Sequence, residues 1–318
     1  MESFKTRYGC LNGISSIDFY DSKNIKSCTL NEENLLQTSY GNLIPQYECS
    51  SERRKYIDSI NFYSNGNLKS LYLQQQAQIA APIGPLPAEL VTFYESGNIK
   101  RIFPLNGKLT AYWSEDDEYN LAEPLKINTP IGEIYKKIIS LYFYEDGNIK
   151  SITFWPKDTI SFNSPIGNIE ARTGISFYDD GSVKSFEPYR PTKTETPIGT
   201  ILAYNNTAHG LHGDSNSVTF SKKGILESLI TTTDKIDLID EFKVKKTYRP
   251  HLKPSIINDA GFDIVPLSIK FDEDSVQFND EPIKYEFKKY SFSIHPNFIK
   301  LETDCSNCSE CSGSCSRG

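Results

Sequence analysis

Four cysteines near the C-terminus are the residues whose spacing most directly predicts chemistry. The pattern Cys-x2-Cys-x2-Cys-x3-Cys is formed by Cys305, Cys308, Cys311 and Cys315. The same spacing occurs in bacterial ferredoxins, where the thiolates hold an iron–sulfur cluster. Thiolates are also ligands of structural zinc. The sequence therefore predicts a metal site in the tail, with an iron–sulfur cluster or zinc as the bound group.

The surroundings of these cysteines leave a second interpretation open. A serine follows each of the four, whereas a proline follows the fourth ferredoxin cysteine. The tail also lacks apolar residues that would shield a cluster. The alternative to a metal site is a flexible thiol-rich peptide that is redox-active or modified.

A glycine-rich stretch at residues 205–214 is a weaker candidate for metal binding. It contains His209, His212 and Asp214, whose side chains are all potential metal ligands. The spacing His-x-x-His is specific only when a helix aligns both rings. A solvated loop is the preferred interpretation, and a carbohydrate-binding cleft around the two histidines is a further one. The acidic run at residues 114–118 is also interpreted as a solvated loop.

Tyrosine and lysine recur at fixed positions of a sequence repeat. The tyrosines are Tyr20, Tyr63, Tyr94, Tyr144 and Tyr178, and the lysines are Lys26, Lys69, Lys100, Lys150 and Lys184. Stacked units would align them into a ribbon able to bind acidic peptides, anionic lipid headgroups or glycans. The predicted binding surface is Tyr63, Lys69, Tyr94, Lys100, Tyr144 and Lys150. The other interpretation, favoured by the acidic net charge, is that lysine stems merely lie over tyrosine rings as cross-strand pairs.

The repeat itself reads Phe-Tyr-x-x-Gly-Asn-aliphatic-Lys-Ser and occurs six times. Copies begin at Phe62, Phe93, Phe143 and Phe177, and degenerate copies begin at Phe19 and Phe220. Lys23 replaces the glycine in the first copy, and Ser221 replaces the tyrosine in the last. Each copy predicts a β-hairpin, because a short loop needs a residue with positive φ and glycine supplies it.

The fourth copy defines the expected pairing within a hairpin. A three-residue loop with Gly147 in the left-handed conformation places Phe143 opposite Ile149 and Tyr142 opposite Lys150. Apolar residues stand two positions before the phenylalanine and six after it in every copy. A third apolar column, nine positions after the phenylalanine, has the opposite parity. Either a bulge shifts the buried face near the serine, or both faces of the sheet are partly covered.

A second phrase, Pro-Ile-Gly, begins at Pro82, Pro130, Pro165 and Pro197. Proline cannot donate to a β-ladder, so the phrase predicts the start of an extra short strand. The phenylalanines of the main repeat are 43, 31, 50, 34 and 43 residues apart. A 31-residue unit is tight for a four-stranded propeller blade. The predicted fold is all-β: tandem hairpins in an elongated twisted sheet or open solenoid, with a six- or seven-bladed propeller as the alternative.

The composition of the chain and the bounds of its repeated region together predict its domain organisation. Hydrophobic residues make up 38% of the 318 residues and the mean hydropathy is −0.45, which suits a thin core. The repeat domain is expected over 1–233, a β-rich C-terminal cap over 234–300, and a flexible Cys/Ser-rich tail over 301–318.

Charge and motifs restrict the classes of function. The net charge of −7 disfavours general nucleic-acid binding, which needs a basic surface, and makes peripheral membrane contact a lesser alternative. No apolar leader or membrane-spanning segment is present in the sequence, so the expected location is cytoplasmic. No phosphate loop, nucleophile elbow or dinucleotide fingerprint occurs, so nothing points to an enzyme.

The hairpin phrase resembles the MORN-like repeat of bacterial antitoxin-type proteins. The matching positions are Tyr63, Gly66, Leu68 and Lys69, with their equivalents in the copies at Phe93 and Phe143. It is also similar to the YD repeats of large bacterial wall and toxin proteins. The resemblance covers roughly residues 15–230 and implies a membrane- or protein-interaction platform without catalytic residues. The Pro-Ile-Gly phrase and the uneven spacers depart from both families.

Two functional hypotheses follow from these features. The first is a non-enzymatic cytosolic scaffold that presents the tyrosine and lysine face to a protein partner. The second is a metal-binding or redox protein that uses the four tail cysteines.

Overall fold

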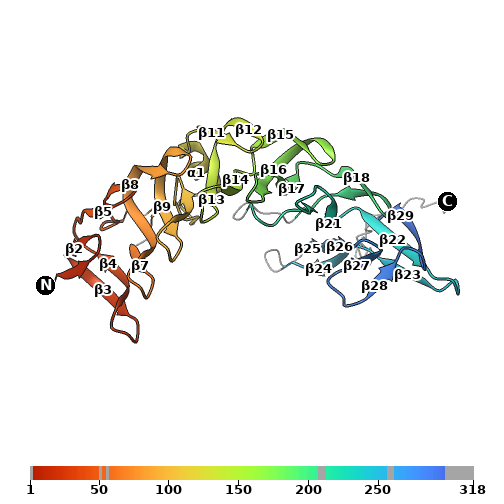
Figure 1. The fold of residues 1–318 in the computed structure, drawn as a ribbon, viewed down its shortest axis with the longest axis horizontal. Helices are drawn as coiled ribbons and strands as arrows, with labels where there is room; N and C mark the ends of the chain where they lie inside the picture. Colours follow the sequence, from red (N-terminus) through yellow and green to blue (C-terminus); the bar gives the residue numbers. More distant parts are fainter. Residues whose placement is uncertain (1–2, 50–51, 55–56, 207–212, 256–260, 298–318) are drawn as a thin grey trace, which may run out of the picture.

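The computed structural model describes residues 3–49, 52–54, 57–206, 213–255 and 261–297 (Figure 1). The described chain is almost entirely β, as predicted, and forms an arch. Its one described helix, α1 (Glu115–Leu121), has seven residues, and no described helix is long and apolar enough to cross a membrane.

The main element is one continuous antiparallel sheet of sixteen strands that follows the arch from β3 to β28. Fifteen strands form its path: β3 (Ile14–Phe19), β4 (Ile25–Leu30), β7 (Ile60–Phe62), β8 (Leu68–Ala81), β9 (Gly84–Phe93), β10 (Ile99–Phe103), β13 (Ile138–Phe143), β14 (Ile149–Phe154), β16 (Gly167–Phe177), β17 (Val183–Pro188), β20 (Val218–Phe220), β21 (Leu226–Thr231), β26 (Leu267–Phe271), β27 (Ser275–Phe278) and β28 (Lys284–Glu286). The sixteenth strand, β15 (Thr159–Ser164), pairs with β16. This single open sheet has the elongated form that was predicted and does not divide into the separate blades of a propeller.

Each copy of the repeat forms a hairpin of this sheet. In the fourth copy Phe143 lies opposite Ile149, as predicted. The Gly147 amide donates to the Tyr144 carbonyl at 3.0 Å, and the Tyr144 amide donates to the Asn148 carbonyl at 2.8 Å. Gly147 has a φ of +92°, and Lys23 adopts a φ of +63° in the copy that lacks the glycine.

The expected pairing of Tyr142 with Lys150 is wrong, and the reason explains the parity of the apolar columns. Tyr142 lies opposite Ser151, because Lys150 is the extra residue of a β-bulge. All six copies have the same register shift, next to the pair formed by the repeat phenylalanine and the aliphatic residue six positions after it. The bulge places Ile149 and Ile152 on one face, so the first of the two predicted explanations is correct.

The Pro-Ile-Gly phrase is a turn between two strands, which corrects its assignment as the start of one. Thr129 pairs directly with Gly132, so Pro130 and Ile131 form a two-residue loop. The Thr129 hydroxyl closes the turn by donating to the Gly132 carbonyl at 2.6 Å. Only the glycine begins a strand, because the proline lacks the amide hydrogen that strand pairing requires.

Small hairpins built on this turn form a second row of β-structure. Two of them were not recognised in the sequence, since Thr6-Arg7-Tyr8-Gly9 and Thr38-Ser39-Tyr40-Gly41 replace the proline and isoleucine. Two more small hairpins use the end of β8 with the start of β9, and β15 with the start of β16. The other strands of the row are β1 (Phe4–Thr6), β2 (Gly9–Leu11), β5 (Leu36–Thr38), β6 (Gly41–Leu43), β11 (Leu125–Thr129), β12 (Gly132–Lys136), β18 (Thr192–Thr196) and β19 (Gly199–Ala203).

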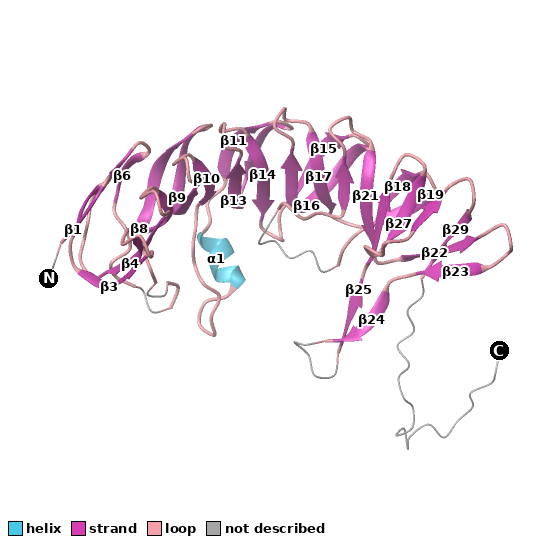
Figure 2. Ribbon diagram, turned by 60° about the horizontal axis from the view of Figure 1, so that its bottom comes forward, coloured by secondary structure: helices cyan, strands magenta, loops and turns pink. Residues whose placement is uncertain are grey.

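The hydrophobic core lies between the main sheet and this row (Figure 2). In Figure 2 the small hairpins run along the upper side of the sheet, and α1 lies below it. Two of the small hairpins contact a main hairpin further along the chain through an aromatic pair: the Tyr8 ring stacks on Phe62, and Tyr40 packs on Phe93. From the second copy to the sixth, the repeat phenylalanine is at most 2% exposed.

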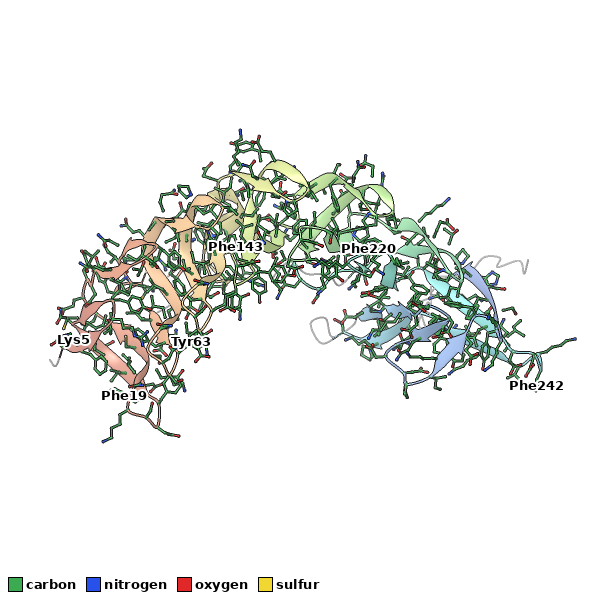
Figure 3. The ribbon with its side chains drawn as sticks, viewed as in Figure 1. Lys5, Phe19, Tyr63, Phe143, Phe220 and Phe242 are labelled. Atoms are coloured by element: carbon green, nitrogen blue, oxygen red, sulfur yellow. The ribbon has the colours of Figure 1, made fainter. Side chains whose placement is uncertain are left out.

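The first hairpin departs from this pattern. Phe19 is 50% exposed and lies at the N-terminal end of the arch, whereas Phe143 and Phe220 lie within it (Figure 3). The aromatic neighbour of Phe19 is Phe4 of the small hairpin β1–β2, with the ring centroids 6.0 Å apart and the rings tilted. Phe62 and Phe93, which pack against a tyrosine at the turn of a preceding small hairpin, are much more deeply buried than Phe19.

The residues after 233 contribute to three structures. Strands β26, β27 and β28 continue the main sheet beyond β21. A second sheet contains β22 (Asp234–Ile239), β23 (Lys245–Tyr248) and β29 (Ser291–Pro296), and a hairpin joins β24 (His251–Pro254) to β25 (Phe262–Val265). The two sheets meet where the Tyr248 ring stacks on Phe278 at 4.3 Å.

Candidate binding surface

The repeated tyrosines and lysines form a surface that we call the tyrosine–lysine ladder. Its five rungs are Tyr20 with Lys26, Tyr63 with Lys69, Tyr94 with Lys100, Tyr144 with Lys150, and Tyr178 with Lys184. The lysines stand at the bulges of β4, β8, β10, β14 and β17, which are alternate strands of the sheet. Neighbouring rungs are therefore about 9.6 Å apart, twice the spacing of paired strands. The uneven sequence distances are absorbed by the small hairpins and by the insert that contains α1.

The tyrosine of each rung is bonded to the next hairpin. The Tyr144 hydroxyl donates to the Phe177 carbonyl at 2.9 Å, and the Tyr94 hydroxyl donates to the Phe143 carbonyl at 2.8 Å. The other three tyrosines make the same contact at 2.8–2.9 Å. Burial raises the pKa of Tyr63, Tyr144 and Tyr178, which keeps these hydroxyls protonated as donors.

The asparagine of the repeat makes a parallel bond across the same boundary. The Asn98 amide donates to the Glu145 carbonyl at 2.9 Å, and the Asn148 amide donates to the Asp179 carbonyl at 3.2 Å. The recurrence of tyrosine and asparagine thus has a structural cause, since both join consecutive hairpins. These bonds hold the rungs in a fixed arrangement.

The effect of one tyrosine hydroxyl can be measured directly. We expect Tyr144→Phe to lower the free energy of unfolding by about 1 kcal/mol, because the Phe177 carbonyl loses its donor. Tyr135→Phe, on an exposed side chain of β12, should change it little. Urea denaturation of both variants checks this, and equal effects would argue against the inter-hairpin bond.

In four of the five rungs the lysine lies over the ring of its tyrosine. The distance from Nζ to the ring centroid is 5.8 Å for Lys69, 5.6 Å for Lys100, 5.4 Å for Lys150 and 5.6 Å for Lys184. This is the cross-strand packing that one interpretation of the sequence anticipated. Lys26 and Lys69 are exposed, and the other three lysines are half-buried.

The ladder lysines differ from many others in having no carboxylate partner. Among the described residues none of the five makes an ion pair, whereas eight other lysines do: Lys126, Lys157, Lys222, Lys245, Lys246, Lys270, Lys284 and Lys289. Side chains alternate along a strand, so Tyr144 points away from the small hairpins that cover Phe143. The ladder is thus a row of unpaired positive charge on the other face of the main sheet.

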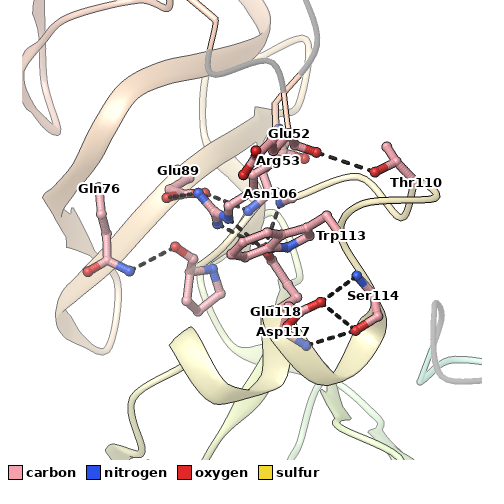
Figure 4. A network of polar contacts seen from close by, with 12 residues as sticks. Glu52, Arg53, Gln76, Glu89, Asn106, Thr110, Trp113, Ser114, Asp117 and Glu118 are labelled. Carbon is pink, nitrogen blue, oxygen red and sulfur yellow. Dashed lines mark hydrogen bonds and ion pairs between the residues drawn. The ribbon is translucent and has the colours of Figure 1, made fainter.

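A second cluster, buried and closed, surrounds Arg53 (Figure 4). The Arg53 guanidinium donates to the carboxylate of Glu89 at 2.7 Å and to that of Glu118 at 2.8 Å. Glu118 also accepts hydrogen bonds from the Gly107 amide and the Trp113 indole, both at 2.7 Å. The two carboxylate side chains are 7% and 6% exposed. Because these groups satisfy one another, the cluster acts as a structural clamp on the insert between β10 and β11.

This cluster corrects the interpretation of residues 114–118 as a solvated loop. Ser114 caps α1: its hydroxyl accepts a hydrogen bond from the Asp117 amide, and Asp117 bonds back to the Ser114 amide. Glu118 turns inward to Arg53. The sequence around Glu118 does not indicate this pairing, because Arg53 lies 65 residues away in the chain.

The clamp makes the insert sensitive to acid. Burial raises the pKa of Glu118, but hydrogen bonds from Arg53 and Trp113 outweigh it, so this pKa lies below its ordinary value. The carboxylate therefore adds stability above about pH 4.3, and that stability is lost as the pH falls through the lower folded pKa. In a Trp155→Phe variant, the fluorescence of Trp113 should report this loss of stability as a step below about pH 4.3. Adding Glu118→Gln should abolish the step, and a step centred above about pH 4.3 would contradict the account.

The metal-ligand candidates from the sequence are only partly within the described chain. Cys305, Cys308, Cys311 and Cys315 lie outside the described residues, as do His209 and His212. Asp214 is described, and it accepts hydrogen bonds from Arg101 at 2.7 Å and from Ser151. Within the described ranges no three His, Cys, Asp or Glu side chains are grouped to hold a metal ion.

The other cysteines have separate environments. Cys28 is fully buried in the core, where burial and the nearby Asp58 raise the pKa of its thiol to about 12. Cys10 and Cys49 are exposed and free.

Comparisons of the chain with family models, curated proteins and solved structures found no significant match. The resemblance to MORN-like repeats therefore stays a prediction from the sequence.

Proposed function

We propose that this chain is a non-enzymatic cytosolic scaffold that binds a protein partner along the tyrosine–lysine ladder. The supporting observation is the row of evenly spaced lysines that have no carboxylate partner among the described residues. On a chain of net charge −7 such a row is a local positive feature. The tyrosine and asparagine bonds hold it in place before a partner arrives, which reduces the entropy lost on binding.

The surroundings of the ladder favour a protein over a membrane or a nucleic acid. The hairpin turns beside it carry the exposed carboxylates of Asp21, Glu95 and Glu145, and that of Asp179, which pairs with Lys222. A bilayer or nucleic acid presents continuous negative charge and would face these groups together with the lysines. A protein segment can match the positive row without meeting its acidic flank.

A capture experiment tests the proposal. Immobilised wild-type protein is compared with a ladder variant, Lys69→Gln/Lys100→Gln/Lys150→Gln, and with a control variant, Lys193→Gln/Lys223→Gln/Lys288→Gln. The control lysines are exposed and make no ion pair among the described residues, so both variants lose the same charge. Proteins retained by wild type and control but lost by the ladder variant support the proposal. Equal retention by all three counts against it.

A second candidate function rests on the spacing of the tail cysteines. We propose as this alternative that Cys305, Cys308, Cys311 and Cys315 bind an iron–sulfur cluster or zinc, with the thiolates as ligands. The test uses protein purified without oxygen, full length beside a chain ending at Glu302. Iron with sulfide, or stoichiometric zinc, that is lost with the tail would support it. Equal metal content and visible spectra in the two proteins would exclude a tail site.

A further inference from the structure

We propose that the ladder binds an extended acidic peptide that carries a carboxylate at every third residue. This inference rests on the proposed function and specifies the chemistry of the partner. It starts from the spacing of the rungs, which the sequence alone does not reveal. Sequence distances of 43, 31, 50 and 34 residues become equal steps of two strands each.

The step between rungs matches the repeat of a polyproline-type chain. Two strand spacings are about 9.6 Å, and three residues of a polyproline-type chain span about 9 Å. A polyproline helix also has three residues per turn, so residues i, i+3 and i+6 share one face. A peptide of about 13 residues could therefore place five side chains on the five lysines.

The chemistry of a rung suits a carboxylate followed by an apolar group. The Lys150 ammonium is without an ion-pair partner in the described chain. It lies 4.4 Å from the centroid of the Tyr142 ring and 5.4 Å from that of the Tyr144 ring, and it donates a hydrogen bond to the Tyr142 hydroxyl at 3.4 Å. A carboxylate can accept from the ammonium, while an apolar residue or proline packs on the neighbouring aromatic ring, as in other grooves that recognise polyproline segments.

The acidic turns limit the width of the ligand. Glu145 lies in the hairpin turn, whereas Lys150 is the second residue of β14. A single peptide chain follows one row of side chains and can avoid the row of carboxylates. A broad anionic surface cannot, so a peptide fits the ladder better than a bilayer does.

Two synthetic peptides of equal composition test the match. In the periodic 13-residue peptide glutamate occupies every third position and proline and alanine fill the rest; in the grouped peptide the five glutamates are consecutive. Fluorescence anisotropy at low ionic strength should show at least tenfold tighter binding of the periodic peptide. The ladder variant should lose about tenfold in affinity for it, and the control variant less than twofold.

A further variant separates charge from folding. Lys69→Arg/Lys100→Arg/Lys150→Arg keeps the charge of the ladder and should retain binding, so a loss confined to the glutamine variant reflects the missing charge. Circular dichroism checks that each variant is folded.

The remaining outcomes distinguish a failure of this inference from a failure of the proposed function on which it rests. Equal binding of the grouped peptide overturns the three-residue match and leaves the scaffold proposal standing. The same holds if neither peptide binds but a captured protein depends on the ladder lysines. Ladder-dependent binding to vesicles of anionic lipid, with no binding to either peptide, overturns both.

Discussion

Phe143→Ala is expected to lower the free energy of unfolding by about 3–5 kcal/mol, because it removes a fully buried ring from the core. The ring lies between the main sheet and the row of small hairpins, where neighbouring side chains can collapse only partly into the space left behind. Urea denaturation followed by circular dichroism measures the loss.

The first copy of the repeat offers a control at the same repeat position. Phe19 occupies the corresponding site but is 50% exposed, so Phe19→Ala should cost only about 1 kcal/mol. Similar losses for the two variants would contradict the expectation that the cost follows the burial of the ring.

Arg53→Ala should have an effect of comparable size, about 3–5 kcal/mol, because it leaves two buried carboxylates without their cation. Glu89 would keep the Asn106 amide as a donor, and Glu118 would keep Gly107 and Trp113. Hydrogen exchange should report the loss first in the insert around α1, and urea denaturation gives its size.

Two further variants identify the cause. Adding Glu89→Gln and Glu118→Gln to Arg53→Ala should recover part of the stability, because the unpaired charges are then removed. Lys126→Ala breaks the exposed pair with Glu133, whose side chains are 69% and 54% exposed, and should have little effect. A small loss for Arg53→Ala would contradict the clamp.

Much of the fold could be predicted because its signals are local. The glycine of each hairpin turn and the alternating apolar columns lie within a dozen residues, so they predict hairpins and one buried face. The sequence could not establish the bulge at Lys150, because a bulge and a sheet covered on both faces predict the same apolar columns. The small hairpins at residues 4–11 and 36–43 were missed, because their turns share only the glycine with Pro-Ile-Gly.

The candidate site divides in the same way. Because tyrosine and lysine recur at fixed positions of the repeat, the sequence predicts that stacked hairpins align them in two columns. The bond from Tyr144 to the Phe177 carbonyl could not be predicted, because it depends on the offset between neighbouring hairpins. The Arg53 clamp joins segments far apart in the chain and carries no motif. The equal spacing of the rungs required the sheet order, since the linkers between copies differ in length.

The most direct test of the central claim is the chemical reactivity of each lysine in free and partner-bound protein. A lysine acylating reagent followed by mass spectrometry gives this value for every site. With a protein retained by the capture experiment, the account predicts protection of Lys69, Lys100 and Lys150 and unchanged reactivity of the control lysines Lys193, Lys223 and Lys288. Unprotected ladder lysines in a saturated complex would contradict it, because the partner would then bind elsewhere.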